Sequence, residues 1–330
     1  MSGQIWSVDA DGGYQYSDQL SDDLRQDLIP MTKFRQFTEL GDGHEQGLNR
    51  GDTFRWNVYS KIARSGRRLE ENQRMPESQY TVQQHSLTVY EGGNSVPYSG
   101  KLEALSQHET KAIIDKTLRL DARNYFDAEA YLQFDQTKLR AVAASGTSTT
   151  AIALAENGTT GVTNNVAMGN GHVKAITDEM RERNIPAHID DDYCCLSRPK
   201  TLRPLKDDLE GINQYTDVGI QKIFNGEIGR YDGCRFIAQT GIAEGGAIDS
   251  TTFDAYDGTG DAWNNALSSW AFYFGGDTVK EAVVQPEEIR AKMPGDYGRD
   301  KGMAWYYLGG FGIVHDDALN SRIVKWDSAA

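Results

Sequence analysis

The residues best suited to chemistry in this chain are a histidine and three aspartates in the stretch "HIDDDYCC". His188 and Asp190 to Asp192 carry the nitrogen and carboxylate groups that bind divalent cations. An acidic loop that leads into a strand is the simpler explanation of the same residues. A second stretch, "HETKA" at 108–112, begins like a zinc-protease helix, but Ala112 stands where the second histidine is needed. We therefore predict no metal-binding residues.

Glycine-rich stretches raise the question of phosphate binding. "GGNSVPYSGKLE" at 92–103 has Ser95 and Leu102 where a phosphate-binding loop needs a glycine and a hydroxyl. "GNGHVKA" at 169–175 has a lysine in place of the third glycine of a dinucleotide motif. The glycines of "FNGEIGRYDGCRFIAQTG" at 224–241 fit either a phosphate cradle or a turn before a strand. No catalytic constellation emerges, so we predict no catalytic or cofactor-binding residues and no enzyme.

Composition narrows the class of protein. The chain has 330 residues and a formal net charge of −14, which argues against a dedicated nucleic-acid binder. The N-terminus lacks the basic residues and apolar core of a signal peptide, and no apolar run is long enough to span a membrane. Cys194 and Cys195 are adjacent, so in a strand their side chains leave on opposite faces. We expect reduced core thiols in a protein made in a cytoplasm.

The first hundred residues divide into an arm and a hairpin. Residues 1–50 resemble an arm with one short helix, on which Leu20, Leu24 and Leu28 form a narrow apolar stripe. Residues 51–100 form a long hairpin in which alternate residues of the first strand share one face and "TVQQHSLTVY" at 81–90 returns. The residues expected on that face are Phe54, Trp56, Val58 and Ile62.

The tip of this hairpin is polar and basic. Between Arg50 and Arg74 seven basic residues stand against three acidic ones, an excess of four positive charges on an acidic chain. For an isolated monomer a solvated loop explains this composition. A tip this polar has little to pack on within its own domain, so the alternative is an arm that docks on the acidic surface of a neighbouring subunit.

Residues 101–145 contain neither glycine nor proline and keep a helical apolar period. "SQHE" at 106–109 resembles a capping box, and the weakest point of the pattern lies at 121–124. A continuous helix of about 35 residues would be about 50 Å long, which suggests a structural spine. Residues 146–165 are rich in small residues and predict a connector.

The remaining chain alternates helix and strand and then becomes strand-rich. "GHVKAITDEMRERNIP" predicts a helix with Val173, Ile176 and Met180 facing inward, and "YCCLSRP" predicts a buried strand. "KTLRPLKDDLEGIN" predicts a helix or a turn, "YTDVGIQKIF" predicts another helix, and residues 241–265 predict a loop. Long apolar strands fill the last sixty residues. This alternation is typical of an α/β or an α+β fold, and we predict the α+β class.

The order of these parts resembles the major capsid proteins of tailed phages with the HK97-type fold, and is most similar to the family of N4-like podoviruses. Four stretches carry the resemblance over about residues 19–326: "LIPMTKFRQF", "NIPAHIDDDYCCLSRP", "FNGEIGRYDGCRFIAQTG" and "GMAWYYLGGFGIVHDDALNSRIVKW". The stretch "GGAIDSTTFDAYDGTGDAW" does not match the family. By this resemblance, Gly226 and Gly229 give a tight turn with positive φ, and Gly233 leads into a strand.

The resemblance implies a division into five parts. These are an N-terminal arm at 1–50, an extended hairpin (the E-loop) at 51–100, the spine helix and connector of a peripheral domain at 101–165, an inserted α/β axial domain at 166–275, and the C-terminal strands of the peripheral domain at 276–330.

The implied function is a shell subunit that self-assembles into hexamers and pentamers of an icosahedral phage head. Such a head encloses double-stranded DNA without sequence-specific binding and is assembled in the host cytoplasm. The implied partners are other copies of the chain, portal and scaffolding proteins and a cement protein, with no membrane and no cofactor. Arg64, Arg67 and Arg68 at the hairpin tip are the candidates for intersubunit charge pairs.

Two other classes stay open on sequence grounds. One is a cytoplasmic metal-dependent hydrolase that uses His188 and Asp190 to Asp192. The other is a different virion component, such as a cement or tail protein. The charged hairpin followed by a long helix favours the shell subunit.

Overall fold

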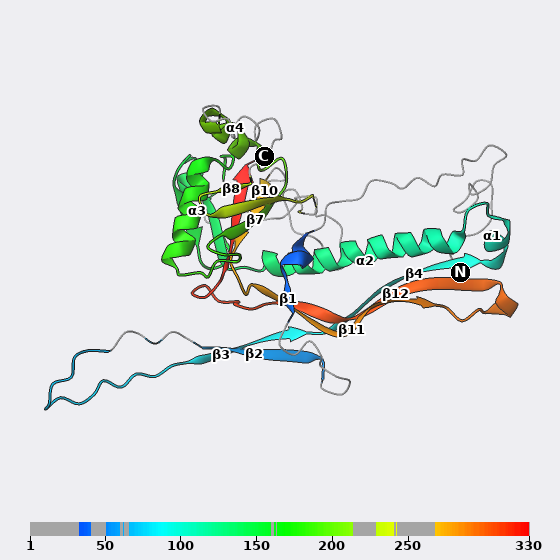
Figure 1. Cartoon of the computed structure of the whole chain (residues 1–330), viewed down its shortest axis with the longest axis horizontal. Helices are drawn as coiled ribbons and strands as arrows, with labels where there is room; N and C mark the ends of the chain where they lie inside the picture. The colour runs from blue at the N-terminus through cyan, green and yellow to red at the C-terminus, as the bar shows by residue number, and fades with distance from the viewer. Residues whose placement is uncertain are drawn as a thin grey trace.

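The computed structural model describes residues 33–40, 51–59, 62, 66–159, 162, 164–213, 229–240, 242 and 268–329. In these ranges a four-stranded sheet, a seven-stranded sheet and a two-stranded hairpin are joined by one long helix (Figure 1). The predicted arm helix, the predicted helix at 215–224 and most of the 241–265 loop lie outside the described residues. None of the helices in the described ranges has the length and apolar character needed to cross a membrane.

The predicted 101–145 helix is two helices followed by a strand. Helix α1 (Gly100–Leu105) begins at Ser99, whose side chain accepts a hydrogen bond from the Leu102 amide. Helix α2 (Thr110–Asp135) has 26 residues, about 39 Å. Strand β5 (Leu139–Ala143) follows and is buried at all five positions. The prediction of one helix was wrong because a short apolar run does not distinguish a buried strand from a helix by its period.

A finer prediction for this segment was also wrong. Ser106 ends α1 and donates to the His108 carbonyl, while α2 starts at Glu109 with no side-chain cap, so "SQHE" is not a capping box. The weak point of the pattern at 121–124 does not break the helix, and α2 runs through it. Asp121 accepts hydrogen bonds from Asn94 (2.9 Å) and from the Trp305 indole (2.7 Å). The carboxylate thus fastens the middle of α2 to the sheet below it.

The four-stranded sheet forms the floor under α2 (Figure 1). Its order is β1 (Glu39–Leu40), β11 (Val279–Ala291), β12 (Asp300–Ile313) and β4 (Tyr90–Ser99). Pairing is antiparallel between β11, β12 and β4 and parallel between β1 and β11. Phe126 of α2 contacts the Tyr307 ring edge to face at 4.6 Å, and Leu118 and Ile114 are buried about two and three turns earlier on the same stripe.

The seven-stranded sheet is buried on both faces. Its order is β6 (Ile152–Ala155), β5, β13 (Ile323–Ala329), β10 (Ser268–Phe274), β7 (Tyr193–Ser197), β9 (Cys234–Ala238) and β8 (Arg230–Tyr231). One face packs on the C-terminal half of α2, and the other on α3 (Asn170–Glu182) and α4 (Arg203–Asn213). Double burial explains the continuous apolar strands at the end of the chain.

Several predictions about this sheet are confirmed. Val173, Ile176 and Met180 of α3 are fully buried, and α3 ends before Pro186. Cys194 lies in the core shared with α2, whereas Cys195 lies in the core shared with α3, on the opposite face. All three cysteines are free and buried, and burial raises the pKa of the Cys194 thiol to about 11. Burial also raises the pKa of the Cys234 thiol, so neither Cys194 nor Cys234 is a thiolate at neutral pH.

Strand pairing crosses the predicted domain limits. Strand β13, from the predicted C-terminal group, pairs with β5 of the part at 101–165 and with β10, most of which falls in the predicted axial domain. The chain therefore passes between the two sheets at β10–β11 and returns at β12–β13. The five-part division of the chain stays a prediction.

The hairpin is confirmed and is shorter than expected. Strands β2 (Thr53–Tyr59) and β3 (Val82–Thr88) pair antiparallel and project away from the rest of the molecule (Figure 1). Phe54, Trp56 and Val58 are half-buried, while the alternate residues of β2 after Thr53 are exposed. Ile62 lies beyond the strand and is exposed. Residues 90–99, expected in the hairpin, form β4 and pair with β12.

Glycines at the end of β12 let the hairpin root sit close to the sheet. A Cβ on Gly310 would lie 2.5 Å from the Thr88 carbonyl oxygen, and a Cβ on Gly312 would lie 3.0 Å from the Leu87 Cβ. Leu87 is buried there, and the Trp56 indole donates to the Val314 carbonyl at 3.1 Å. The "GGFG" stretch at 309–312 is thus the part of β12 on which the root of the hairpin packs.

We expect Gly310→Ala to loosen the hairpin root, because the added methyl group meets backbone rather than a flexible side chain. The cost should be about 1–3 kcal/mol of unfolding free energy, with faster proteolysis between residues 60 and 80. Gly302→Ala on the same strand is the control, since its nearest neighbours are at 3.5 Å, an ordinary contact. Equal stability and equal cleavage of the two variants would contradict the role of Gly310.

Candidate functional site

The end of the N-terminal arm is fixed in the core by an aromatic anchor. Phe34, in the 3₁₀ turn η2 (Phe34–Phe37), is fully buried against the rings of Tyr131, Phe134 and Phe272 at 5.2–5.7 Å. Its amide donates to a carboxylate oxygen of Asp127 on α2 at 2.7 Å. The arm thus meets the long helix and the seven-stranded sheet at one residue.

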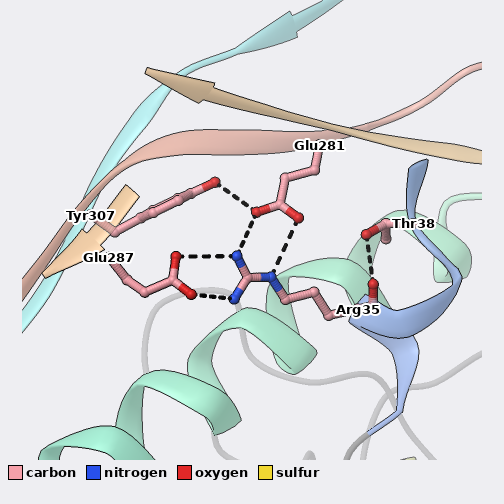
Figure 2. Close-up of polar contacts among 5 residues, drawn as sticks. All are labelled: Arg35, Thr38, Glu281, Glu287 and Tyr307. Atoms are coloured by element: carbon pink, nitrogen blue, oxygen red, sulfur yellow. Dashed lines mark hydrogen bonds and ion pairs between the residues drawn. The ribbon is translucent and has the colours of Figure 1, made fainter. Parts of the chain in front are cut away.

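Arg35 binds two carboxylates of β11 at once (Figure 2). It donates to Glu281 at 2.9 and 3.3 Å and to Glu287 at 3.1 and 3.3 Å, so both contacts are bidentate. The Tyr307 hydroxyl donates to Glu281 at 3.2 Å, and the guanidinium lies 4.0 Å from the centre of the Phe126 ring. Arg35 therefore joins the arm, α2 and both central strands of the floor.

The electrostatics of this cluster favour its charged form. Burial alone would lower the pKa of Arg35, but the hydrogen bonds from its guanidinium to Glu287 and Glu281 and their charges raise it above its ordinary value. Burial and the neighbouring Glu281 raise the pKa of Tyr307, so its hydroxyl stays a donor. Glu281 is 6% exposed at its side chain and Arg35 32%, so the pair is partly shielded from solvent and salt.

Asp127 is a second carboxylate that holds the arm. It is 4% exposed and also accepts a hydrogen bond from the Gln239 amide at 2.6 Å. Burial raises the pKa of Asp127 to about 6, against the opposing effect of the Phe34 and Arg35 amides, Gln239 and the Arg123 charge. The Oε1 atom of Gln239 is buried without a hydrogen-bond partner among the described residues.

A groove of about 840 Å³ lies beside the anchor, between the arm, α2 and the floor. The residues that line it carry both signs of charge. Lys33, Arg119 and Arg123 are basic, and Glu287 and Glu288 are acidic. No element of the described chain brings a nucleophile paired with a base into it. The groove holds ion pairs rather than a catalytic arrangement.

The residues that a metal-dependent hydrolase would use are paired with arginines or packed against aromatic rings. Asp192 is buried and lies 2.7 Å from Arg230 and 2.8 Å from Arg235, and Asp190 lies 3.2 Å from Arg235. The His188 ring packs between the Phe37 and Phe274 rings, each at 5.6 Å. Within the described ranges, no three His, Cys, Asp or Glu side chains gather as a metal site.

The glycines of "FNGEIGRYDGCRF" shape the β8–β9 hairpin. Asp232 and Gly233 both have positive φ, 49° and 72°, as a tight two-residue turn requires. Gly229 has φ 65°, which confirms the positive φ expected there, while Gly226 lies outside the described residues. The turn aligns Arg230 with Arg235 across the two strands, where both reach Asp192.

The structure describes two of the three arginines predicted for contacts at the hairpin tip. Arg67 and Arg68 are exposed in the connection between β2 and β3, and Arg64 lies outside the described residues. The described part of this connection projects from the body of the molecule (Figure 1). The ion pair Arg74–Glu77, at 2.6 Å, is also exposed. Exposed pairs of this kind contribute less than about 1 kcal/mol, so the tip has little internal stabilisation from its charges.

Comparison with solved structures shows which known fold this order of helices and strands has. The chain matches the capsid protein of cyanophage P-SCSP1u with a TM-score of 0.67 and 12% identity, over 96% of this chain and 93% of that chain. It matches the acid-stable capsid of Helicobacter pylori phage KHP30 with a TM-score of 0.66 and 12% identity, over 96% of each chain. The chain has the HK97-type capsid fold.

Comparison of sequences does not detect this similarity to capsid chains. No family model matches the chain, and no curated protein matches it. A gene transfer agent capsid chain, at 15% identity and a TM-score of 0.56, is likewise covered over 99% of its length. In this capsid fold the order of elements is retained although few residues are shared.

Sequence reasoning missed the most connected residue of the site. "LIPMTKFRQF" was noted as an arm segment, but nothing in it distinguishes Arg35 from a solvated arginine. The carboxylates that bind it stand 246 and 252 positions away. The run "PEE" at 286–288, which lies beside a β-bulge of β11, was the available signal.

We expect the unfolding free energy to depend on pH through Asp127. Its pKa is higher in the folded chain than the ordinary value of about 3.9, so its contribution is most favourable below pH 4 and is lost as the pH rises through 6. Asp127→Asn removes this dependence, and its amide can donate to Gln239 Oε1. Urea unfolding at pH 5 and pH 8 should show the variant gaining on the wild type by about 1–1.5 kcal/mol at the higher pH. A difference that does not change with pH would contradict the assignment.

Proposed function

We propose that the chain is the major capsid protein of a tailed phage, which assembles into the hexamers and pentamers of an icosahedral head. The observation that carries this proposal is the match to capsid chains over nearly the full length of both partners. Almost no part of this chain is left over for a different activity. The projecting hairpin supports the same conclusion, because it has the form of an arm that contacts neighbours.

The parts of the chain take their roles from this proposal. The arm at 1–50 and the hairpin within 51–100 reach neighbouring subunits. The spine helix with the four-stranded sheet forms the peripheral domain, in parts 101–165 and 276–330. The inserted part at 166–275 contributes to the axial domain around the centres of the capsomers.

The proposed partners follow from the same role. Copies of the chain bind one another, and portal and scaffolding proteins join during assembly in the host cytoplasm, with a cement protein as a further partner. The head encloses double-stranded DNA. The net charge of −14 suits a shell into which DNA is driven by a motor, because a strongly basic lining would bind phosphates. Within the tailed phages we assign the chain to the N4-like podoviruses, on the four sequence stretches quoted above.

The other candidate functions have less support. A hydrolase at His188 and Asp190 to Asp192 would need free ligands, whereas arginines bind Asp190 and Asp192. We infer a structural protein rather than an enzyme. A cement or tail protein would not account for the near-complete match to capsid chains.

Assembly of the purified chain tests the proposal. The full-length chain is examined at high concentration by negative-stain electron microscopy, with and without the scaffolding protein of its phage. Closed shells, or rings of five and six subunits, are the expected result. A monomer under all conditions would overturn the proposal, and bound metal would then be assayed.

We expect the tip arginines to steer contacts between subunits. The triple change Arg64→Glu, Arg67→Glu and Arg68→Glu should prevent shells at low salt and leave the thermal unfolding of the subunit unchanged, since the tip is exposed. Reversal of Arg299, an exposed residue outside the hairpin, is the matched control. Normal shells from the triple variant would refute the role of these arginines.

A further inference from the structure

Asp127 of α2 is a buried carboxylate whose hydrogen-bond partners in the described chain carry no charge. It is 4% exposed, and it accepts from the Phe34 amide at 2.7 Å and from the Gln239 side-chain amide at 2.6 Å. Glu281 is as deeply buried, but it binds Arg35 at 2.9 Å. An ionised carboxylate is costly to bury when no counterion binds it. The arm anchor therefore disfavours the ionised form of Asp127.

The surroundings of Asp127 act on its charge in both directions. Burial is the largest effect and raises the pKa of Asp127 to about 6. The two arm amides, Gln239 and the charge of Arg123, one turn earlier on α2, act in the opposite direction. The guanidinium of the arm is directed to the carboxylates of β11 instead (Figure 2). The other charged residues that line the groove with Asp127 are Lys33, Arg119, Arg123, Glu281, Glu287 and Glu288.

The protonated form of Asp127 can satisfy a second buried atom. Gln239 is fully buried, and its Oε1 atom has no hydrogen-bond partner among the described residues. An ionised carboxylate can only accept, whereas a protonated one can also donate. Once the Gln239 amide turns over, the Asp127 hydroxyl can donate to Oε1. The present separation of 2.6 Å suits an O–H···O bond better than an N–H···O bond.

The arm lies directly on this carboxyl group. Phe34 is fully buried among three aromatic rings at 5.2–5.7 Å, and its amide points at Asp127. When arm residues 33–40 leave, the carboxylate meets water and loses the arm amides. The ionised form is then no longer penalised by burial. Docking of the arm is therefore linked to uptake of a proton by Asp127.

We propose that Asp127 is a pH-dependent switch for arm residues 33–40. A proton on Asp127 holds the arm on its own subunit, and loss of that proton loosens it. The Arg35 contacts with Glu281 and Glu287 remain, so the arm is weakened rather than expelled. This inference goes beyond the proposed capsid function, because it states what controls the arm within a single subunit.

Glu287 gives the switch a second limit on the acid side. Burial opposes ionisation of Glu287, but its hydrogen bond with Arg35 and the Arg35 charge lower its pKa below the ordinary value. Its contribution is therefore complete above the ordinary value of about 4.3 and is lost in stronger acid. The contribution of Asp127 is lost as the pH rises through 6. The arm should be held most strongly near pH 5, where Asp127 is protonated and Glu287 is ionised.

Hydrogen exchange of the arm amides in the unassembled full-length chain tests the switch. After correction for the intrinsic exchange rate, protection of residues 34–38 should fall about tenfold between pH 5 and pH 8. The amides of β7 should stay far more protected at both pH values, since the arm opens without unfolding of the core. Arm protection that does not change with pH, or that equals that of β7, would overturn the inference.

Two variants separate the proton from the contact. Asp127→Asn keeps an acceptor for the Phe34 amide and cannot titrate, so arm protection should change less than about twofold between pH 5 and pH 8. Glu287→Gln is the matched control. It weakens the arm at both pH values but should keep the tenfold fall. If Asp127→Asn does not fold, the wild type and Glu287→Gln still decide, because the fall must be present in both.

The measurement is independent of shell assembly. A flat pH profile in a chain that forms shells would reject the switch and leave the capsid function intact. A tenfold fall in a chain that forms no shells would support the switch and count against the capsid function.

Discussion

The arrangement of the whole subunit depends on one arginine between two glutamates. Arg35 comes from the arm, Glu281 and Glu287 from β11, and the Phe126 ring beneath it from α2. These elements meet only when the long helix lies on the floor of the four-stranded sheet. Removing one partner of such a shielded cluster leaves the other charges uncompensated, so the cluster specifies the position of the arm as well as stabilising it.

Backbone proximity, rather than charge, positions the projecting hairpin. The hairpin root lies so close to β12 that no side chain fits at Gly310. The four-stranded sheet therefore holds arm residues 33–40 by a charge cluster at β11 and the hairpin root by glycines of β12. Both depend on the register between these two strands, which pair from Val279 and Ile313 to Ala291 and Met303.

Strands that follow one another in the sequence lie in different sheets, and the short connections between them couple the two sheets. Asp277, between β10 and β11, accepts from Arg322 at 3.1 Å, and its amide donates to Glu39 of β1 at 3.0 Å. A hydrogen bond with His315, partly offset by burial, together with the nearby Lys280 and Arg322, lowers the pKa of Asp277 to about 2. It remains charged at physiological pH, so the crossing between the sheets is held by a permanent ion cluster.

The sequence by itself determined the local elements with strong periodic or turn signals. Alternation in β2, the inward stripe of α3, the burial of β7 on both faces and the positive φ of Gly229 follow from side-chain spacing and from the backbone freedom of glycine. The sequence also showed the excess of positive charge at the hairpin tip and the lack of a complete catalytic motif. The resemblance of four short stretches indicated the capsid fold, which the structural matches confirm.

Only the tertiary structure decided which elements lie together. Strand β5 was read as the end of a helix because apolar residues such as Leu139 and Val142 satisfy both periods, and burial on two faces selects the strand. The pairing of β13 with β5, and of Arg35 with Glu281, joins residues roughly two hundred positions apart. Local sequence carries no record of such partners, since their stabilisation appears only after the intervening chain has folded.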